Sequence, residues 1–190
     1  MMDPFLFVLA GAIATLAVVW AVRRAFAFAG QEAQDYVHLL PELDLQKHLT
    51  GRLVCRGMIF GPTGRVTSRF TATMEMSWDG PKGSMVEHFL YDDGTVQDRV
   101  WLIQLHEDGR VETEATDVLG HGTGRIMGNA LGLRYAIQLP PENGSHVLQA
   151  VDWMYLQEDG TILNRSQFRK FGIKVAELFA VIRPMGDDDA

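Results

Sequence analysis

Four charged residues interrupt stretches of this sequence in which apolar residues recur at every second position. They are Glu87, Arg99, Arg134 and Asp152. If these positions face the interior of a barrel, the buried charges must be paired, because an isolated charge is costly to remove from water. An arginine can also hold a carboxylate with two parallel hydrogen bonds. The pattern therefore predicts either internal ion pairs or a site for an acidic head group.

Three uses of these charges remain open. The first is structural, with ion pairs that plug one end of a barrel. The second is a polar floor beneath an apolar cavity, where Arg99 or Arg134 contacts the carboxylate of a ligand. The third is acid–base catalysis by Asp152 or Glu87, with a pKa raised by burial.

Aromatic and methionine side chains supply the apolar part of the candidate site. With the charged residues, the predicted ligand-binding set is Arg99, Trp101, Arg134, Asp152, Trp153, Glu87, Met74 and Phe70. A stripe of large apolar residues is also typical of a filled core. The pattern is consistent with a cavity and with a filled interior, and it assigns no catalytic residue.

Other chemistries find little support in the sequence. None of the six histidines pairs with another His, Cys or Glu at metal-ligand spacing, so we expect no metal and no cofactor. Residues 120–124 are glycine-rich but lack the Gly-Lys-Ser/Thr of a phosphate loop, and we interpret them as a flexible lid or barrel corner. The single cysteine, Cys55, is interpreted as a small buried hydrophobe. A net charge of −7 gives no support for a nucleic-acid partner.

The elements that position these residues are predicted to be β-strands. Three Asp-Gly hairpin signals, at 92–94, 107–109 and 158–160, separate alternating runs. The predicted strands are residues 51–60, 65–78, 84–91, 95–106, 110–117, 130–139, 145–156, 161–168 and 174–183. Residues 118–129 are interpreted as a glycine-rich interruption. The chain is therefore predicted to be mainly β, a single antiparallel up-and-down barrel of about eight or nine strands.

An apolar segment precedes the strands. Residues 5–22 carry no charge, and we predict a transmembrane anchor helix within residues 1–30. Asp3 precedes this segment while Arg23 and Arg24 follow it, the reverse of the order in a cleaved signal peptide. The positive-inside rule then places the barrel in the cytoplasm, with the periplasm as the alternative.

The remaining segments complete a four-part organisation. Residues 31–50 are predicted to be a linker with a short helix over 42–49, which Gly51 ends. The barrel is predicted over residues 51–184. Residues 185–190, which include Asp187 to Asp189, are predicted to be a solvated acidic tail.

Several short motifs together resemble a known family. They are Tyr91-Asp92-Asp93-Gly94, Arg99-Val100-Trp101, Asp117-Val118-Leu119-Gly120, Gly128-Asn129-Ala130-Leu131, Arg134-Tyr135, Asp152-Trp153-Met154-Tyr155-Leu156, Asn164-Arg165-Ser166 and Lys170-Phe171-Gly172. Over residues 43–184 the sequence resembles the bacterial family of domain of unknown function 3833. The resemblance implies a lipocalin-like barrel and no established activity.

The resemblance also bears on location. Similar proteins are membrane-associated or exported, often as lipoproteins, and tend to be encoded beside fatty-acid-modifying enzymes of the cyclopropane-synthase type. This sequence has an apolar helix in place of a lipid-attachment cysteine. We therefore expect a single-pass protein of the bacterial inner membrane.

The leading functional hypothesis is non-enzymatic binding of a fatty-acyl or other lipidic ligand, in support of a lipid-modifying enzyme. One alternative is an accessory or scaffolding subunit with a filled barrel, which meets an integral-membrane partner through the N-terminal helix. A second alternative is a lipid-modifying enzyme, although the sequence favours a protein that is not an enzyme.

Overall fold

The computed structural model describes residues 4–141 and 144–186, in two compact units, Met1–Glu32 and Ala33–Ala190. The first unit consists of α1 (Pro4–Phe26) and a 3-10 turn, η1 (Phe28–Gly30). Within α1, Pro4–Val22 is long and apolar enough to cross a membrane, with a mean hydropathy of 2.5. Length and composition suit a membrane anchor and a signal sequence alike. The side chains of Arg23 and Arg24, and residues 187–190 of the predicted tail, lie outside the described part.

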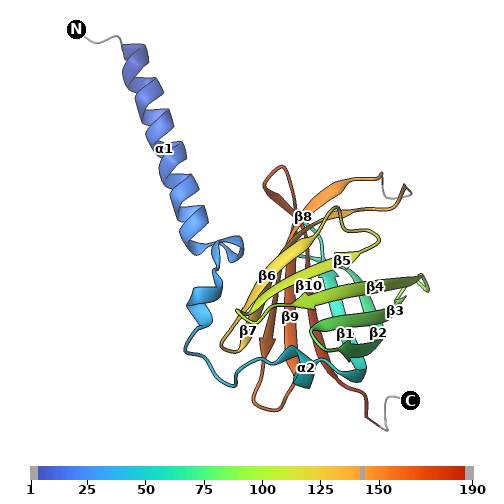
Figure 1. Cartoon of the computed structure of the whole chain (residues 1–190). Coiled ribbons are helices and arrows are strands. Elements are labelled where there is room, and N and C mark those ends of the chain that lie inside the picture. Colours follow the sequence, from blue (N-terminus) through green and yellow to red (C-terminus); the bar gives the residue numbers. More distant parts are fainter. Residues whose placement is uncertain (1–3, 142–143, 187–190) are drawn as a thin grey trace. The chain divides into compact units, whose positions relative to one another are not determined.

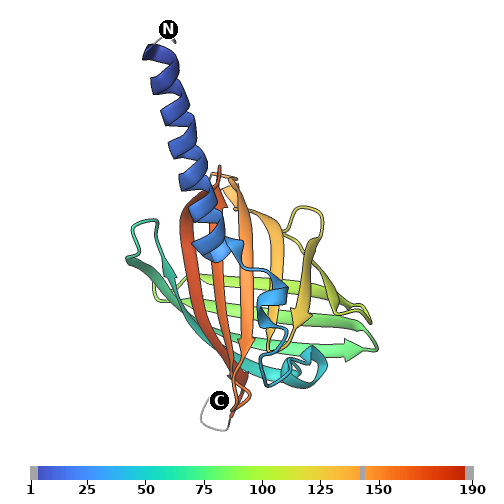
Figure 2. The same ribbon diagram turned by 90° about the vertical axis from the view of Figure 1, so that its left-hand side faces the viewer.

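The second unit is a closed β-barrel (Figures 1 and 2). Its strands are β1 (Gly51–Phe60), β2 (Val66–Asp79), β3 (Lys82–Tyr91), β4 (Val96–Leu105), β5 (Arg110–Ala115), β6 (Gly122–Met127), β7 (Ala130–Gln138), β8 (Val147–Leu156), β9 (Ile162–Lys170) and β10 (Ile173–Pro184). Each strand pairs antiparallel with its neighbours in sequence, and β1 also pairs with β10 to close the sheet. The predicted antiparallel up-and-down barrel is confirmed.

The barrel has ten strands rather than the eight or nine predicted, because β6 lies in the segment interpreted as a glycine-rich interruption. A Cβ atom at Gly122 would lie 2.3 Å from Thr113 Oγ1, and one at Gly124 would lie 2.3 Å from the Gly132 carbonyl oxygen. These glycines allow the neighbouring strands to approach closely. The flexible lid or barrel corner predicted for residues 120–124 is thus largely strand.

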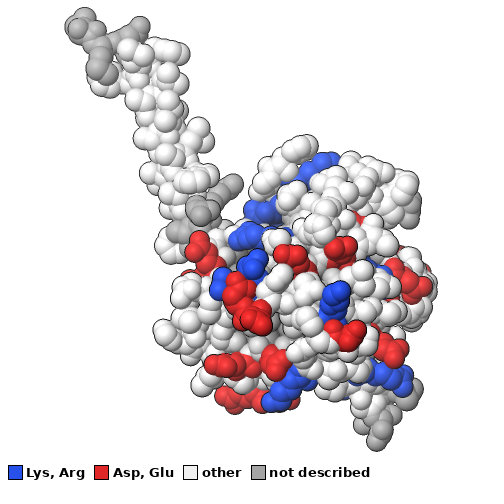
Figure 3. Space-filling model, viewed as in Figure 1, with Lys and Arg blue, Asp and Glu red and all other residues white. Residues whose placement is uncertain are grey.

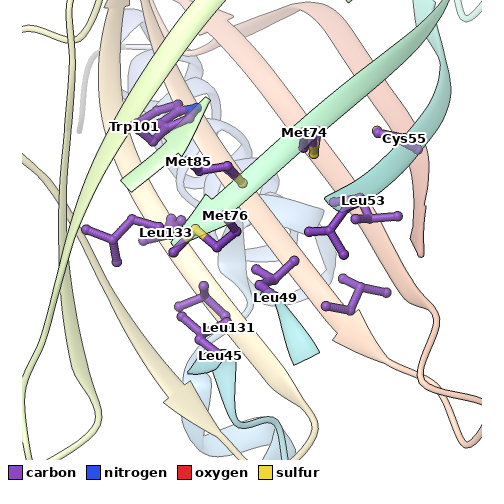
Figure 4. Close-up of a cluster of buried hydrophobic side chains, with 14 of the residues drawn as sticks. Leu45, Leu49, Leu53, Cys55, Met74, Met76, Met85, Trp101, Leu131 and Leu133 are labelled. Atoms are coloured by element: carbon purple, nitrogen blue, oxygen red, sulfur yellow. The ribbon is translucent and has the colours of Figure 1, made fainter. Parts of the chain in front are cut away.

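A short helix plugs one end of the barrel, here called the plugged end. In α2 (Leu45–His48), Asp44 caps the N-terminus by accepting hydrogen bonds from the backbone N–H groups of Gln46 and Lys47. Leu45 and Leu49 are buried, and Figure 4 shows them among the interior side chains of the strands. The indole N–H of Trp78 donates to the Leu49 carbonyl at 2.8 Å. These contacts fix the plug to the barrel wall.

The segment before α2, residues 33–44, forms a strap over the outside of the barrel; it begins with η2 (Ala33–Tyr36) (Figure 2). The ring of Tyr36 packs on those of Trp153 and Tyr155, with centroids 5.0 and 5.5 Å apart. The Leu43 N–H donates to the Gly128 carbonyl at 2.8 Å. The strap therefore covers part of the outer faces of β7 and β8.

The opposite end of the barrel, here called the far end, carries the turn between β9 and β10. Phe171 lies at its tip with φ 52° and is 92% exposed. The last β1–β10 pair joins Phe60 and Glu177, so residues 173–176 extend beyond β1. The β9–β10 hairpin therefore projects past its neighbour on one side.

Candidate functional site

The barrel interior contains a cavity of about 100 Å³. A single water needs roughly 10–15 Å³ on the same measure, so the space is suited to several waters or a slim organic group. The lining is mostly apolar. It includes Leu45, Leu49, Phe70, Met74, Met85, Ile103, Val111, Leu131, Leu133 and Phe168, together with a few polar side chains described below.

Asp152 organises the first part of the polar lining. It lies midway along β8 and accepts hydrogen bonds from Asn164 Nδ2 at 2.6 Å, Ser166 Oγ at 2.7 Å and the Tyr135 hydroxyl at 3.2 Å. Burial raises the pKa of Asp152, and these hydrogen bonds oppose the rise because they stabilise the carboxylate. The group is a buried carboxyl with its oxygens already hydrogen-bonded.

Glu87 is the second buried carboxyl. It lies midway along β3, directly opposite Arg99 on β4, and accepts a hydrogen bond from the Trp101 indole N–H at 3.1 Å. Burial raises the pKa of Glu87 to about 7, although the charge of Arg99 and the Trp101 hydrogen bond lower it. Asp152 and Asp117 contribute to the rise by like-charge repulsion. Glu87 therefore changes charge near neutral pH.

Arg99 is already engaged by an acidic residue. Its guanidinium donates a short hydrogen bond to Asp117 and lies over the Trp101 ring, 5.6 Å from the centroid. Within the described chain, Arg99 Nε and Asp117 Oδ1 are buried without a hydrogen-bond partner. One ion pair thus leaves a donor and an acceptor unused beside it.

The structure brings together most of the predicted site residues. Those that line the cavity are Phe70, Met74, Glu87, Arg99, Trp101 and Asp152. The prediction of a polar floor is wrong in position, because the floor is formed by the leucines of α2 while Glu87 and Asp152 lie halfway along their strands. The polar groups belong to the wall.

Two predicted site residues lie elsewhere. Arg134 is exposed on the outer face of β7, because Leu133 and Tyr135 on either side point inward. Trp153 also faces outward, and its burial comes from the strap, where Tyr36 packs against its ring. Both corrections follow from strand alternation, since adjacent residues cannot face the same side.

Several polar residues of the site were not predicted from the sequence. They are Asp117, Thr113, Asn164 and Ser166. Asn164 and Ser166 lie at every second position between Ile162 and Phe168, so all four share the inward face of β9. This spacing is the signal that could have identified them. Asp117 lies just beyond β5, opposite Arg99 in the β4–β5 register, because Trp101 pairs with Ala115 two residues before it. The Asp-Gly turn at 107–109, which is centred between Arg99 and Asp117, is the signal that could have paired them.

The comparison with protein families is decisive for the classification. Residues 23–184 match the family described as protein of unknown function (DUF3833). The chain belongs to the DUF3833 family. The family expected from the sequence motifs is therefore confirmed, over a longer stretch than residues 43–184.

Solved structures show which fold this DUF3833 member adopts. The crystal structure of Rv2717c from M. tuberculosis is 18% identical, with a TM-score of 0.58 over 78% of this chain and 99% of the other. The S-type phycobiliprotein lyase CPES from Guillardia theta is 6% identical, with a TM-score of 0.53 over 74% of this chain and 90% of the other. No curated protein matches the sequence. The structural likenesses confirm the lipocalin-like fold.

Proposed function

We propose that this DUF3833 protein binds a small lipid-like ligand inside its barrel and does not convert it chemically. The observation that carries the proposal is a largely apolar cavity, inside a closed barrel, that has a few buried polar groups on its wall. Such a combination is typical of sites for small molecules with an apolar body and a polar end.

The distribution of side chains gives the ligand an orientation. The apolar tail is expected toward the plugged end, between Ile103 and Leu49. The polar head is expected beside Arg99, which lies four residues before Ile103 on β4, or ~13 Å along the strand. A fatty-acyl or alkyl chain has the slim shape that this path requires.

The proposal includes a membrane setting. The apolar residues of α1 are exposed, as expected for a helix that faces lipid. With Arg23 and Arg24 on the cytoplasmic side, α1 would hold the barrel at the inner face of a bacterial inner membrane. The membrane would then supply the ligand, and α1 would be available to an integral-membrane partner.

A second candidate function rests on Glu87. A buried carboxyl with a pKa of about 7 that lines a cavity has the properties of a general acid or base. A lipid-modifying enzyme with Glu87 in that role would lose turnover on Glu87→Gln and still hold its substrate. Binding without conversion predicts no turnover in the unmodified protein.

Adjacent residues on β4 provide a matched test of the cavity. Ile103→Trp would fill the cavity, while Leu102→Trp places the same ring on the outer face, where Leu102 is 54% exposed. The full chain is purified in lipid nanodiscs, and its bound lipids are measured by native mass spectrometry and by extraction. Circular dichroism shows that each variant is folded.

We expect one bound lipid-like molecule per chain in the unmodified protein and in Leu102→Trp, and none in folded Ile103→Trp. Absence of a ligand from the unmodified protein would overturn the proposal. Equal retention by the two variants would show that any bound lipid lies outside the barrel.

A further inference from the structure

We infer that the ligand head is an uncharged hydroxyl rather than a carboxylate, a conclusion that rests on the proposed function. The charges around the cavity provide the first reason. Among the described residues that line it, Arg99 is the one basic side chain, against the acidic Glu87 and Asp152. Asp117 adds a third carboxyl that contacts Arg99. An anionic head would therefore meet an excess of buried negative charge.

The engagement of Arg99 is the second reason. A ligand carboxylate is best held by two parallel N–H donors of one guanidinium. In this barrel Asp117 already accepts from the guanidinium, and Glu87 stands opposite on the neighbouring strand. A ligand carboxylate at Arg99 Nε would lie close to both of these acidic groups, and such crowding of like charges at a buried site is unfavourable.

The unused atoms beside the ion pair provide the third reason. Arg99 Nε can donate a hydrogen bond, and Asp117 Oδ1 can accept one. A hydroxyl accepts and donates at the same oxygen, so its chemistry matches an unused donor and an unused acceptor together. A carboxylate or an ester can only accept, and an ammonium can only donate. The site thus favours a slim neutral molecule with a free hydroxyl, such as an alkyl alcohol.

Eight-carbon ligands with matched chains separate these possibilities. The binding of 1-octanol, octanoate, octylamine and methyl octanoate to the full chain in nanodiscs is measured by calorimetry at pH 8, with empty nanodiscs as the blank. We expect 1-octanol to bind at least tenfold more tightly than octanoate, with the ester and the amine between them. Tightest binding of octanoate would overturn the charge argument, and equal binding of ester and alcohol would overturn the role of Asp117 as acceptor.

Two variants make the test specific to the buried charges. Glu87→Gln removes a negative charge next to Arg99, so we expect the preference for 1-octanol over octanoate to fall at least threefold. Glu75→Gln makes the same change on the exposed face of β2 and should leave the preference unaltered. An unchanged preference in Glu87→Gln would contradict the inference. If none of the four compounds binds, the proposed function itself fails.

We also propose that the tip of the β9–β10 hairpin inserts into a lipid surface. Phe171 is 92% exposed and Ile173 is 68% exposed at the far end of the barrel. Phe171 adopts a positive φ of 52°, which a bulky side chain rarely does and which Asn or Gly adopts readily. An aromatic side chain that is almost fully exposed on a strained backbone buries little surface against the barrel, and this points to a role outside it.

The charges of the hairpin indicate which surface it meets. Residues 169–174 at the tip contain Arg169, Lys170 and Lys174 and neither Asp nor Glu. Lys174 is paired with Glu177 further along β10. The Lys170 ammonium lies over the Phe171 ring, 5.7 Å from its centroid. Basic side chains also appear toward this end on the face drawn in Figure 3. Cations around an exposed aromatic residue suit the interface of an anionic leaflet.

Chain length supports a lipid surface over a protein partner. From Phe26, the end of α1, to Ala33, the start of the barrel unit, the chain advances seven residues. Fully extended, this segment reaches at most ~25 Å. With α1 in a bilayer, this reach would limit how far Ala33 lies from the headgroups, so a lipid surface would be available without recruitment of a partner.

A fluorescent label tests the insertion. The natural Cys55 is buried, and burial raises its pKa to about 12, so it should not react with a thiol label. Phe171→Cys and Asp159→Cys, at opposite ends of the barrel, are each labelled with an environment-sensitive dye in nanodiscs that contain anionic lipid. Lipids with a quencher in the acyl chain should quench the label at position 171 and spare the one at 159. Equal quenching by aqueous iodide at both positions would overturn the proposal.

Discussion

The two ends of the barrel differ in whether their large apolar side chains are buried or exposed. At the plugged end, Leu45 and Leu49 of α2 are almost fully buried among the strands. At the far end, Phe171 and Ile173 project into the surroundings. Burial makes the first pair a source of stability, while exposure gives the second pair none. The difference indicates that the plugged end holds the fold together and that the far end is shaped for contact with something else.

The largest effect is expected from a glycine at the plugged end. A Cβ atom at Gly128 would lie 1.9 Å from the Tyr36 carbonyl oxygen and 2.8 Å from that of Leu39. Because both atoms are backbone, Gly128→Ala should displace the strap and lower the free energy of unfolding by about 4 kcal/mol. Gly172→Ala at the far end has a similar positive φ and nothing within 4 Å, so it should cost about 1 kcal/mol. Urea unfolding measures both, and equal losses would contradict the contrast.

The next effect is expected from the plug itself. Leu49 is 2% exposed, and Leu49→Ala should lower the free energy of unfolding by roughly 3 kcal/mol through lost burial and a new cavity. Ile173→Ala removes apolar atoms that are mostly in solvent, and it should change stability by about 0.5 kcal/mol or less in detergent. Thermal and urea unfolding of the two variants decide whether stability resides at one end.

A smaller effect is expected from the polar wall between the two ends. The pKa of Glu87 is about 7 in the folded state, compared with an ordinary value of 4.5 in the unfolded state. The folded state therefore holds the Glu87 proton more tightly. The resulting stabilisation is complete below pH 4.5 and is lost as the pH rises through 7. Between pH 5 and pH 8 the unmodified protein should lose roughly 2–3 kcal/mol of stability that Glu87→Gln does not lose. Glu75→Gln should retain the pH dependence of the unmodified protein, and parallel profiles for all three would show that Glu87 is not shifted.

The smallest effect is expected at the far end and has the opposite sign. Phe171→Asn places at the turn a residue that tolerates positive φ, so it should raise the free energy of unfolding by about 1 kcal/mol in detergent. In anionic nanodiscs the lost lipid contact should offset that gain. A loss of stability in detergent would show that Phe171 supports the barrel and would weaken the contrast between the ends.

The strands were predictable where one face is apolar and the other polar. Residues 65–78 were predicted to within one residue of β2, because Ala72, Met74 and Met76 alternate with the exposed Thr71, Thr73 and Glu75. β6 was not predicted, since its role depends on the absence of side chains at Gly122 and Gly124. Hydrophobic periodicity does not reveal a strand that packs by close approach of its backbone, because such a strand has no alternating apolar side chains.

The site was predictable where a charge lies among apolar residues of the same face, as at Glu87, Arg99 and Asp152. It was not predictable for Trp153, because the strap that buries it lies more than a hundred residues earlier in the sequence. Contacts such as that between Tyr36 and Trp153 are absent from the local pattern and appear only in the assembled barrel. The pair of Arg99 and Asp117 could instead have been predicted, because the β4–β5 hairpin sets these two positions opposite each other.

The pairing of β1 with β10 has a consequence during synthesis. Leu53 leaves the ribosome well over a hundred residues before its partner Pro184. At 5–20 residues per second, roughly 7 to 26 seconds pass before the strand that pairs with this edge of β1 has been synthesised. Throughout that interval the nascent chain presents an unpaired edge, while α1 has already emerged. Early capture of α1 by the membrane would keep neighbouring nascent chains apart until the last strand arrives.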